Sequence, residues 1–411
     1  MQRIATFLLT LFLATLIGGC ATTRDPAPVR DARAAPAQIK PVPAVIAPTR
    51  PAPTPQAEAP AVKTTPPLAS AAPTLAEKAA LGKPDALSPH IGLLLPLSTQ
   101  TFRQPAEAVK QGVLAAAKSQ PDMPAVRVYP TTDQVSNILA VYQQAVENGA
   151  RVIIGPLTKN AVAALAESDI SAVPTLALSV PTNEIASPNL YLFGLALDAE
   201  TRQVAHLAAS EGHDTVLIVA ASNALGKHLQ SAFSEEWQQL GGKIVGQLSF
   251  TSNTDLSTLH DKLEKLQPES IFLAVNASEA RLVRPYLSAV IPTYATSLTF
   301  GGQTDAQKNV DLSGVRFLDM PWMLQPDHPA VMIYPRPEKP LSIDSERLYA
   351  MGIDAYRLAQ LFYRGEMPTR GVVLDGVTGQ ISLSGGRQFT RDLTAAEFQT
   401  DVVVVLDNAK P

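Results

Sequence analysis

Residues 88–411 predict an α/β fold with two lobes, each built on a parallel β-sheet. Three observations support this prediction. Short apolar runs alternate with amphipathic stretches of helical spacing. The alternation stops at Tyr191-Leu192-Phe193 and then starts again with the same pattern, and the tail changes to one long helix followed by strands. Because repeated strand–helix–strand units require parallel strands with right-handed crossovers, each series of units predicts one lobe.

The first lobe is predicted from four apolar runs and the helical stretches between them. Residues 91–96 are typical of a buried strand that ends at a proline, and residues 103–118 carry Val109 and Val113 at helical spacing. The predicted strands are residues 91–96, 126–129, 152–154 and 174–178, and the predicted helices are residues 103–118, 135–147 and 158–167.

The second lobe repeats this pattern, and the tail adds a helix and a hairpin. The turn at Ser384-Gly385-Gly386 joins the two hairpin strands. The predicted helices are residues 198–210, 227–240, 256–266, 279–287 and 345–363, and the predicted strands are residues 215–220, 243–250, 270–275, 293–297, 380–383, 389–393 and 402–406.

The N-terminus has the features of a lipoprotein signal peptide. Arg3 gives a positive charge, residues 4–17 are apolar, and Gly18 and Gly19 are small residues directly before Cys20. Cys20 is the one cysteine of the 411 residues, so we expect cleavage after residue 19 and lipid attachment to its thiol. The alternatives are an ordinary secretory signal with a chance cysteine and an uncleaved membrane helix, although the apolar run is short for a span.

Residues 20–87 predict a disordered tether that is rich in proline and alanine. Residues 21–84 contain no Phe, Trp or Tyr, so the segment cannot bury enough apolar area to offset its ordering entropy. Proline favours an extended chain of about 3.1 Å per residue, which gives a maximal reach on the order of 200 Å. A passive spacer is the simpler interpretation. A long tether on a lipid anchor also predicts that the folded part acts away from its membrane.

Composition and motifs indicate a protein without catalytic chemistry. The net charge of −4 excludes the basic footprint of a nucleic-acid-binding protein, and no Gly-x-Ser-x-Gly, Ser-x-x-Lys, His-Glu-x-x-His or phosphate-loop motif is present. We therefore expect no enzyme, no cofactor and no metal site. Asp198 and Glu200 are expected to complement a helix N-terminus, and Trp237 is expected in the core. Surface or helix-end positions are predicted for all histidines: His90, His206, His213, His228, His260 and His328.

Candidate ligand contacts lie in the loops that follow the predicted strands of the first lobe. Parallel α/β sheets bind ligands at the carboxyl ends of their strands, and the hydroxyls there belong to Ser98, Thr99, Ser179 and Thr182. They could receive a ligand carboxylate together with helix N-terminal amides. The alternative is that they are helix N-caps and turn residues.

The predicted lobes, final helix and hairpin resemble the type I periplasmic-binding-protein fold. That resemblance implies three passages of the chain between the lobes, which we expect near Leu195, Pro321 and Pro368. The expected organisation is a signal peptide at 1–19, a lipid-anchored linker at 20–87 and a two-lobed domain at 88–411, with lobe 1 at about 88–195 and 321–367 and lobe 2 at about 196–320 and 368–411.

Five segments together resemble the C-terminal domain of the penicillin-binding protein activators of the LpoA (YraM) family. The segments are residues 91–98 (IGLLLPLS), 153–157 (IIGPL), 174–178 (PTLAL), 349–356 (YAMGIDAY) and 374–383 (LDGVTGQISL), of which the last two are the most specific. The resemblance covers residues 88–411. Longer family members carry a helical repeat domain ahead of this one, whereas here the Pro/Ala linker holds that place.

The resemblance implies a lipoprotein of the outer membrane, facing the periplasm, that binds and activates a class A penicillin-binding protein, the peptidoglycan glycosyltransferase/transpeptidase. Outer-membrane sorting also agrees with Ala21, because an aspartate after the lipidated cysteine is the signal for retention at the inner membrane. Two other hypotheses remain open. One is a lipid-anchored periplasmic solute-binding protein for amino acids or peptides, and the other is an enzyme of cell-wall turnover.

Overall fold

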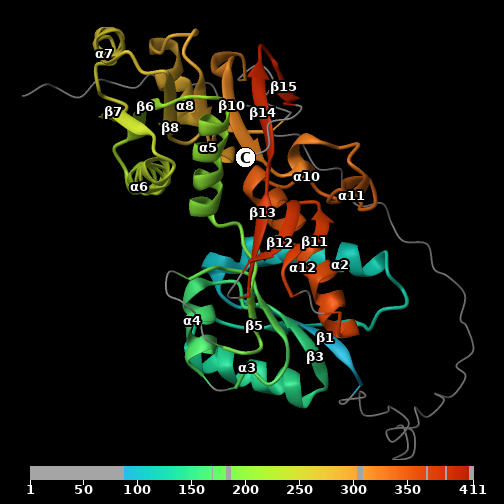
Figure 1. The fold of residues 1–411 in the computed structure, drawn as a ribbon. Helices are drawn as coiled ribbons and strands as arrows, with labels where there is room; N and C mark the ends of the chain where they lie inside the picture. Colours follow the sequence, from blue (N-terminus) through green and yellow to red (C-terminus); the bar gives the residue numbers. More distant parts are fainter. Residues whose placement is uncertain are drawn as a thin grey trace, which may run out of the picture. The chain divides into compact units, whose positions relative to one another are not determined.

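The computed structural model describes residues 88–168, 170–181, 187–302, 309–366, 369–384 and 387–406. Two mixed, mostly parallel sheets organise this part of the chain (Figure 1). The predicted two-lobed α/β fold class is therefore confirmed. The expected signal peptide, Cys20 and the linker lie outside the described residues, as do Thr182, Pro368 and the two glycines of the predicted turn at 385–386.

The first sheet has the strand order β11-β12-β13-β5-β4-β3-β1-β2. Its pairs from β2 to β13 are parallel, whereas β11, β12 and β13 form antiparallel pairs. The strands are β1 (His90–Leu95), β2 (Val126–Pro130), β3 (Ala150–Ile154), β4 (Thr175–Ala177), β5 (Leu190–Leu192), β11 (Gly371–Gly376), β12 (Gly379–Ser384) and β13 (Gln388–Asp392).

Helices cover both faces of this sheet, as parallel sheets require. On one face α3 (Val135–Glu147) and α4 (Lys159–Glu167) enclose an apolar cluster that includes Leu94, Tyr142 and Val162. On the other face α2 (Gln100–Lys118) packs along α12 (Ile343–Arg364), and their buried side chains join the main core. The sheet is thus buried on both sides.

The second sheet has the strand order β15-β14-β10-β9-β8-β6-β7, with parallel pairs from β7 to β10 and antiparallel pairs beyond. Helices α5 and α6 pack against each other, and α6 lies on β6, β7 and β8. The strands are β6 (Thr215–Ala221), β7 (Lys243–Phe250), β8 (Ser270–Ala274), β9 (Thr293–Ala295), β10 (Val315–Asp319), β14 (Thr394–Gln399) and β15 (Val402–Val405).

The remaining helices connect these strands. The longer ones are α5 (Leu197–Ser210), α6 (Ala224–Gln239), α7 (Leu259–Leu266) and α8 (Ala277–Val283), and the short ones are α10 (Pro321–Leu324), α11 (Pro329–Met332) and the 3₁₀ turns η1 (Arg284–Tyr286), η2 (Ser297–Thr299) and η4 (Val310–Leu312). Trp237 of α6 is fully buried and stacks on Phe233, so its predicted core position is confirmed.

The third passage between the sheets differs from the predicted one. We expected residues 368–411 in the second lobe, but β11, β12 and β13 extend the first sheet, and β13 pairs with β5 at Gln388 and Leu192. The chain enters the second sheet only at β14, one residue after β13 (Figure 1). The physical reason is an aromatic cluster in which Phe389 packs on Phe193 and Phe362 of the first lobe.

Candidate functional site

The main candidate site is a cavity of about 570 Å³ that both lobes line. The loop after β3 supplies Leu157, and the segment after β4 supplies Ser179. Gly155 makes the first loop possible, because its φ of +106° is left-handed and a Cβ there would lie 2.1 Å from the carbonyl oxygen of Leu94. Residues 195–199 of the first passage, helices α4, α5, α6 and α12, and Gln388 of β13 complete the lining.

Cationic side chains outnumber acidic ones on this lining. Lys159 begins α4, and Arg202 lies on α5, where its Nε is 3.5 Å from a carboxylate oxygen of Glu236. Asp198 is the lining acid, and its Oδ1 is 2.6 Å from Nε2 of His228. The lining therefore combines Lys159, an Arg202 that faces the Glu236 carboxylate, and an Asp198 carboxylate whose Oδ1 lies close to His228 but makes no hydrogen bond.

The predicted contact residues occupy different places. Ser179 lines the cavity. Ser98 is exposed, and Thr99 is the N-cap of α2, although its side chain makes no capping hydrogen bond and instead lies 3.5 Å from Asp133 Oδ1. Neither is among the lining residues of the described part, and Thr182 lies outside the described residues. Lys159, Arg202 and His228 were not predicted, because helical periodicity places them on solvent faces.

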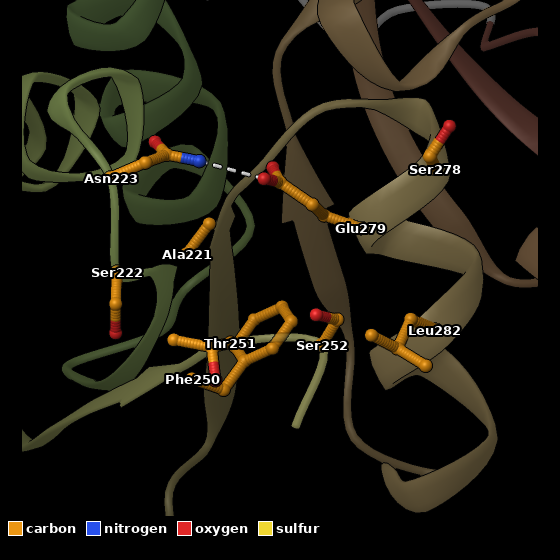
Figure 2. Close-up of a pocket in the computed structure, with 9 residues that line it drawn as sticks. All are labelled: Ala221, Ser222, Asn223, Phe250, Thr251, Ser252, Ser278, Glu279 and Leu282. Atoms are coloured by element: carbon orange, nitrogen blue, oxygen red, sulfur yellow. Dashed lines mark hydrogen bonds between the residues drawn. The ribbon is translucent and has the colours of Figure 1, made fainter. Parts of the chain in front are cut away.

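A second cavity of about 360 Å³ lies at the carboxyl edge of the second sheet (Figure 2). Asn223 and Glu279 point toward one another across it, and the Asn223 amide donates to Glu279 Oε1 at 2.7 Å. Asn223 also caps α6 through Gly226 N, and Glu279 Oε2 accepts from Asn276 N in the capping box of α8. These polar groups serve the helix ends, so the inter-lobe cavity is the stronger candidate.

A buried ionic cluster connects the chain passages beside the candidate site. Arg347 of α12 binds both carboxylate oxygens of Asp319, the last residue of β10, and donates to the carbonyl oxygen of Ser297. Glu200 of α5 accepts the N–H of Ser297 at 2.5 Å. Burial, with a contribution from the charge of Asp319, raises the pKa of Glu200 to about 7. The guanidinium thus holds α12 to the second lobe.

The two most specific family segments contact each other through Asp354. Its carboxylate is fully buried and accepts hydrogen bonds from Val377 N, Thr378 N and Thr378 Oγ1. Arg391, also buried, donates to the carbonyl oxygens of Gly194 and Thr378. Burial raises the pKa of Asp354 and lowers that of Arg391. These residues fix the hairpin against α12 and the first passage.

The histidines follow the prediction with one exception. His90 is buried on β1, where Nε2 lies 2.9 Å from Tyr129 Oη, so its predicted surface position is wrong. The apolar environment of β1 lowers its pKa. In the described ranges no cluster of three or more His, Cys, Asp or Glu side chains could hold a metal ion. No helix within those ranges is long and apolar enough to cross a membrane.

Two mostly parallel α/β lobes around a cavity, with three chain passages between them, define a two-lobed protein of the periplasmic-binding-protein kind. Residues 83–401 match the family described as "LppC putative lipoprotein", and the chain belongs to this family.

Curated relatives of the chain are penicillin-binding protein activators named LpoA. The protein from Pantoea ananatis (strain LMG 20103) is 28% identical over 350 residues, which cover 74% of this chain and 51% of that protein. The Haemophilus influenzae protein is 29% identical over 329 residues, which cover 77% and 55%. The resemblance predicted from the sequence is confirmed. The chain spans about half the length of these relatives.

Two solved structures share the fold over most of the described residues. One is described as "LpoA (YraM) C-domain from Haemophilus influenzae, a regulator of PBP1A"; it has a TM-score of 0.63 and 24% identity, covering 78% of this chain and 100% of that one. The other is a "putative branched-chain amino acid ABC transporter" from Chromobacterium violaceum ATCC 12472, with a TM-score of 0.66 and 37% identity, covering 75% and 100%.

Proposed function

We propose that this chain is a lipid-anchored regulator of peptidoglycan synthesis that binds and activates a class A penicillin-binding protein. The observation that carries the proposal is the family match over residues 83–401, together with relatives that are named activators. The whole of the Haemophilus influenzae regulator's C-domain has a counterpart in the fold of this chain. We therefore assign the regulatory role to the two-lobed part.

The proposal also places the protein at the periplasmic face of the outer membrane, anchored through Cys20. The small residues before Cys20 and the Pro/Ala-rich segment after it support export, lipidation and a long reach. Lipid attachment is tested by mass spectrometry of the purified protein. A mature N-terminus at Cys20 that carries acyl chains is expected, and an unmodified chain would remove this part of the proposal.

Partner binding is tested by crosslinking the full-length protein in cell envelopes and identifying the captured proteins. We expect a class A penicillin-binding protein among the crosslinked partners. The matched control is the same capture after the partner gene has been deleted, which should remove the crosslinked species. Capture that never contains a peptidoglycan synthase would contradict the proposal.

A second candidate function is a lipid-anchored solute receptor for amino acids or peptides. The relative that favours it is the Chromobacterium violaceum structure at 37% identity, whose description names a branched-chain amino acid transporter. The inter-lobe cavity of about 570 Å³ has room for a small molecule. A bound ligand raises thermal stability by mass action. Melting temperatures that stay constant with every amino acid and short peptide would count against this function.

A further inference from the structure

We propose that an exposed apolar surface beside α11 is the site where the folded chain docks on the penicillin-binding protein. This α11 surface consists of Met332, Ile333, Val372 and a neighbouring cavity, which an apolar anchor side chain of the partner would enter. Because the partner is the one named under the proposed function, this inference rests on that proposal and adds the contact surface to it.

The α11 surface exposes large apolar side chains to water. Met332 of α11 and Ile333 directly after it are 68% and 59% exposed, and Val372 of β11 is 62% exposed. Helix α11 contacts β11 (Figure 1), and Nε2 of His328, the N-cap residue of α11, lies 3.7 Å from a carboxylate oxygen of Asp375 on β11. The three apolar side chains therefore belong to neighbouring elements. Exposed apolar side chains that are grouped in this way are typical of protein–protein contact surfaces.

A third cavity, of about 590 Å³, lies next to these side chains. Arg336 lines it and follows Ile333 by three residues, a stretch of chain that spans at most about 10 Å. Pro326, which precedes α11, lines it as well. In the described part of the chain it shares no lining residue with the inter-lobe cavity. The apolar part of its wall consists of Trp322, Met323, Leu341, Ile343 and three prolines.

A guanidinium stacked on an aromatic ring contributes to the wall of this cavity. Trp322 is fully buried, and Cζ of Arg336 lies 4.0 Å from the centroid of its ring. A carboxylate oxygen of Glu346 lies 3.9 Å from an Arg336 nitrogen and helps to hold the arginine in place. An arginine held in this way has less rotamer freedom to lose when a partner binds. Trp and Arg side chains next to apolar pockets carry much of the binding energy of protein interfaces, so the cavity is suited to an anchor side chain.

The two most family-specific segments support the α11 surface from the inside. In the first segment, on α12, the Tyr349 ring packs 5.5 Å from the Trp322 ring, and its hydroxyl donates to the carbonyl oxygen of Pro335 at 2.8 Å. In the second segment, on β11 and β12, the carbonyl oxygen of Val377 accepts the backbone N–H of Trp322 at 2.9 Å. Exposure alone would not select this surface, since Val290 of the second lobe is 89% exposed. Because residues typical of the activator family hold the α11 surface, we assign it to the partner of that family.

The charges around the α11 surface favour a protein partner over a membrane. The cations Arg336 and Lys339 are accompanied by the exposed acids Asp327, Glu338 and Asp375. Apolar surfaces that bind anionic membranes are bordered mainly by lysine and arginine. A border that carries both signs of charge agrees with the polar rim of a protein interface.

Binding of the full-length protein to an immobilised class A penicillin-binding protein tests the α11 surface. Met332→Asp and Ile333→Asp are the informative variants, because both positions are exposed and a polar substitution there changes stability little. We expect each to weaken binding about tenfold, with a matching loss in the stimulation of glycan polymerisation. Met332→Leu and Ile333→Leu keep the apolar surface and should bind as the parent protein does. Val290→Asp is the matched control at an exposed apolar position outside the α11 surface, and it should also bind normally.

Failure of this inference and failure of the proposed function give different results. If the parent protein does not bind the synthase, the proposed function is wrong and the docking site with it. If the parent protein binds and both aspartate variants bind equally well at unchanged melting temperature, only the docking site is wrong. Two further measurements address other occupants: sedimentation with vesicles of phosphatidylethanolamine and phosphatidylglycerol, and molar mass by light scattering. Loss of vesicle binding or of a dimer in the aspartate variants, with synthase binding unchanged, would also overturn the inference.

Discussion

Arg347 illustrates at the scale of single residues how this fold fixes its inter-lobe junction. One guanidinium on α12 contacts Asp319 at the end of β10 and the carbonyl oxygens of Ser297 and Phe300. Glu200 reaches the same point from α5 through Ser297 N. Removing one partner of such a buried pair leaves an uncompensated charge, which costs more than the net contribution of the pair. The cluster therefore favours one arrangement of the lobes.

Glu200→Gln should stabilise the protein at pH 8 and have little effect at pH 5. The pKa of Glu200 in the folded protein is about 7, against an ordinary value of 4.5, so the folded protein binds more protons and loses stability as pH rises between these values. The glutamine mimics the protonated carboxyl and removes that loss, on the order of 2 kcal/mol.

Urea unfolding of both proteins across pH 5 to 8 measures this difference. The matched control is Glu147→Gln, at an exposed position at the end of α3, which should leave the pH dependence unchanged. If Glu200→Gln and the parent protein differ in free energy of unfolding by the same amount at pH 5 and at pH 8, the raised pKa of Glu200 is wrong.

The sequence predicted part of this residue-scale chemistry. Glu200 does lie in the first turn of α5, as expected from the macrodipole argument. Its burial depends on Ser297, Asp319 and Arg347, which follow it far along the chain. A local sequence pattern does not predict contacts between residues that lie so far apart in the chain. Similarly, residues 349–356 could be recognised from the sequence as a segment typical of the family. The hydrogen bonds that Asp354 accepts from Val377 and Thr378 could be seen only in the folded structure.

At the scale of elements, the contact between α2 and α12 determines how the first lobe holds the tail. Gly112 of α2 and Gly352 of α12 lie where the two helices cross. A Cβ at Gly112 would lie 1.9 Å from Tyr349 O, and one at Gly352 would lie 2.3 Å from Val109 O. The two backbones approach to a distance that only glycine allows, which explains the glycine within the specific segment at 349–356.

Gly352→Ala should therefore destabilise the protein, by about 1–3 kcal/mol, because the helices must move apart to admit the methyl group. The loss should exceed the gain of up to about 1 kcal/mol from the better helix propensity of alanine. Chemical denaturation monitored by circular dichroism measures the change. Gln111→Ala, at an exposed position of α2 next to Gly112, is the control and should be close to neutral. Increased stability of Gly352→Ala would contradict this packing.

Long periodic elements were predictable, as were the short strands β3, β4 and β9, whereas some other short strands were not. The helix Val135–Glu147 and the strand Lys243–Phe250 have the predicted bounds. The strands β10 and β14 were missed, since β14 reads TAAEFQ and its alanines and glutamate have no strand preference. Its strand state comes from pairing with β10 and β15. The hairpin of β12 and β13 was predicted in the second lobe but belongs to the first sheet. Alternating apolar residues show that one face of a strand is buried, but they do not show which strand it pairs with.

At the scale of the whole molecule, the two lobes could be predicted because the strand–helix pattern restarts after residue 193. The cavity could not be predicted, since its lining combines both lobes, the first passage and α12.

The proposed lipid anchor determines where in the cell envelope the folded part can act. A lipid at Cys20 and an extended tether would set where the folded part can meet a synthase, and the folded part would supply the contact.

Replacing Cys20 by alanine tests that spatial argument in cells. We expect Cys20→Ala to be exported but not acylated, and to lose most of its activating effect at equal abundance. Acylation contributes about 0.8 kcal/mol per buried methylene, so its loss releases the protein from the membrane. Immunoblots of fractionated envelopes check the location, and synthesis of labelled peptidoglycan checks the effect. Full activity of the unanchored protein would show that the tether is not part of the mechanism.

The rate of glycan polymerisation by a purified class A penicillin-binding protein is the most direct test of the proposed function. The full-length protein, in detergent with the synthase and its lipid-linked precursor, is titrated against a fixed amount of enzyme. We predict a saturable increase in rate that depends on the folded two-lobed part and is absent when the protein is heat-denatured. A rate that stays constant over the whole titration, with a synthase shown to be active, would contradict the account.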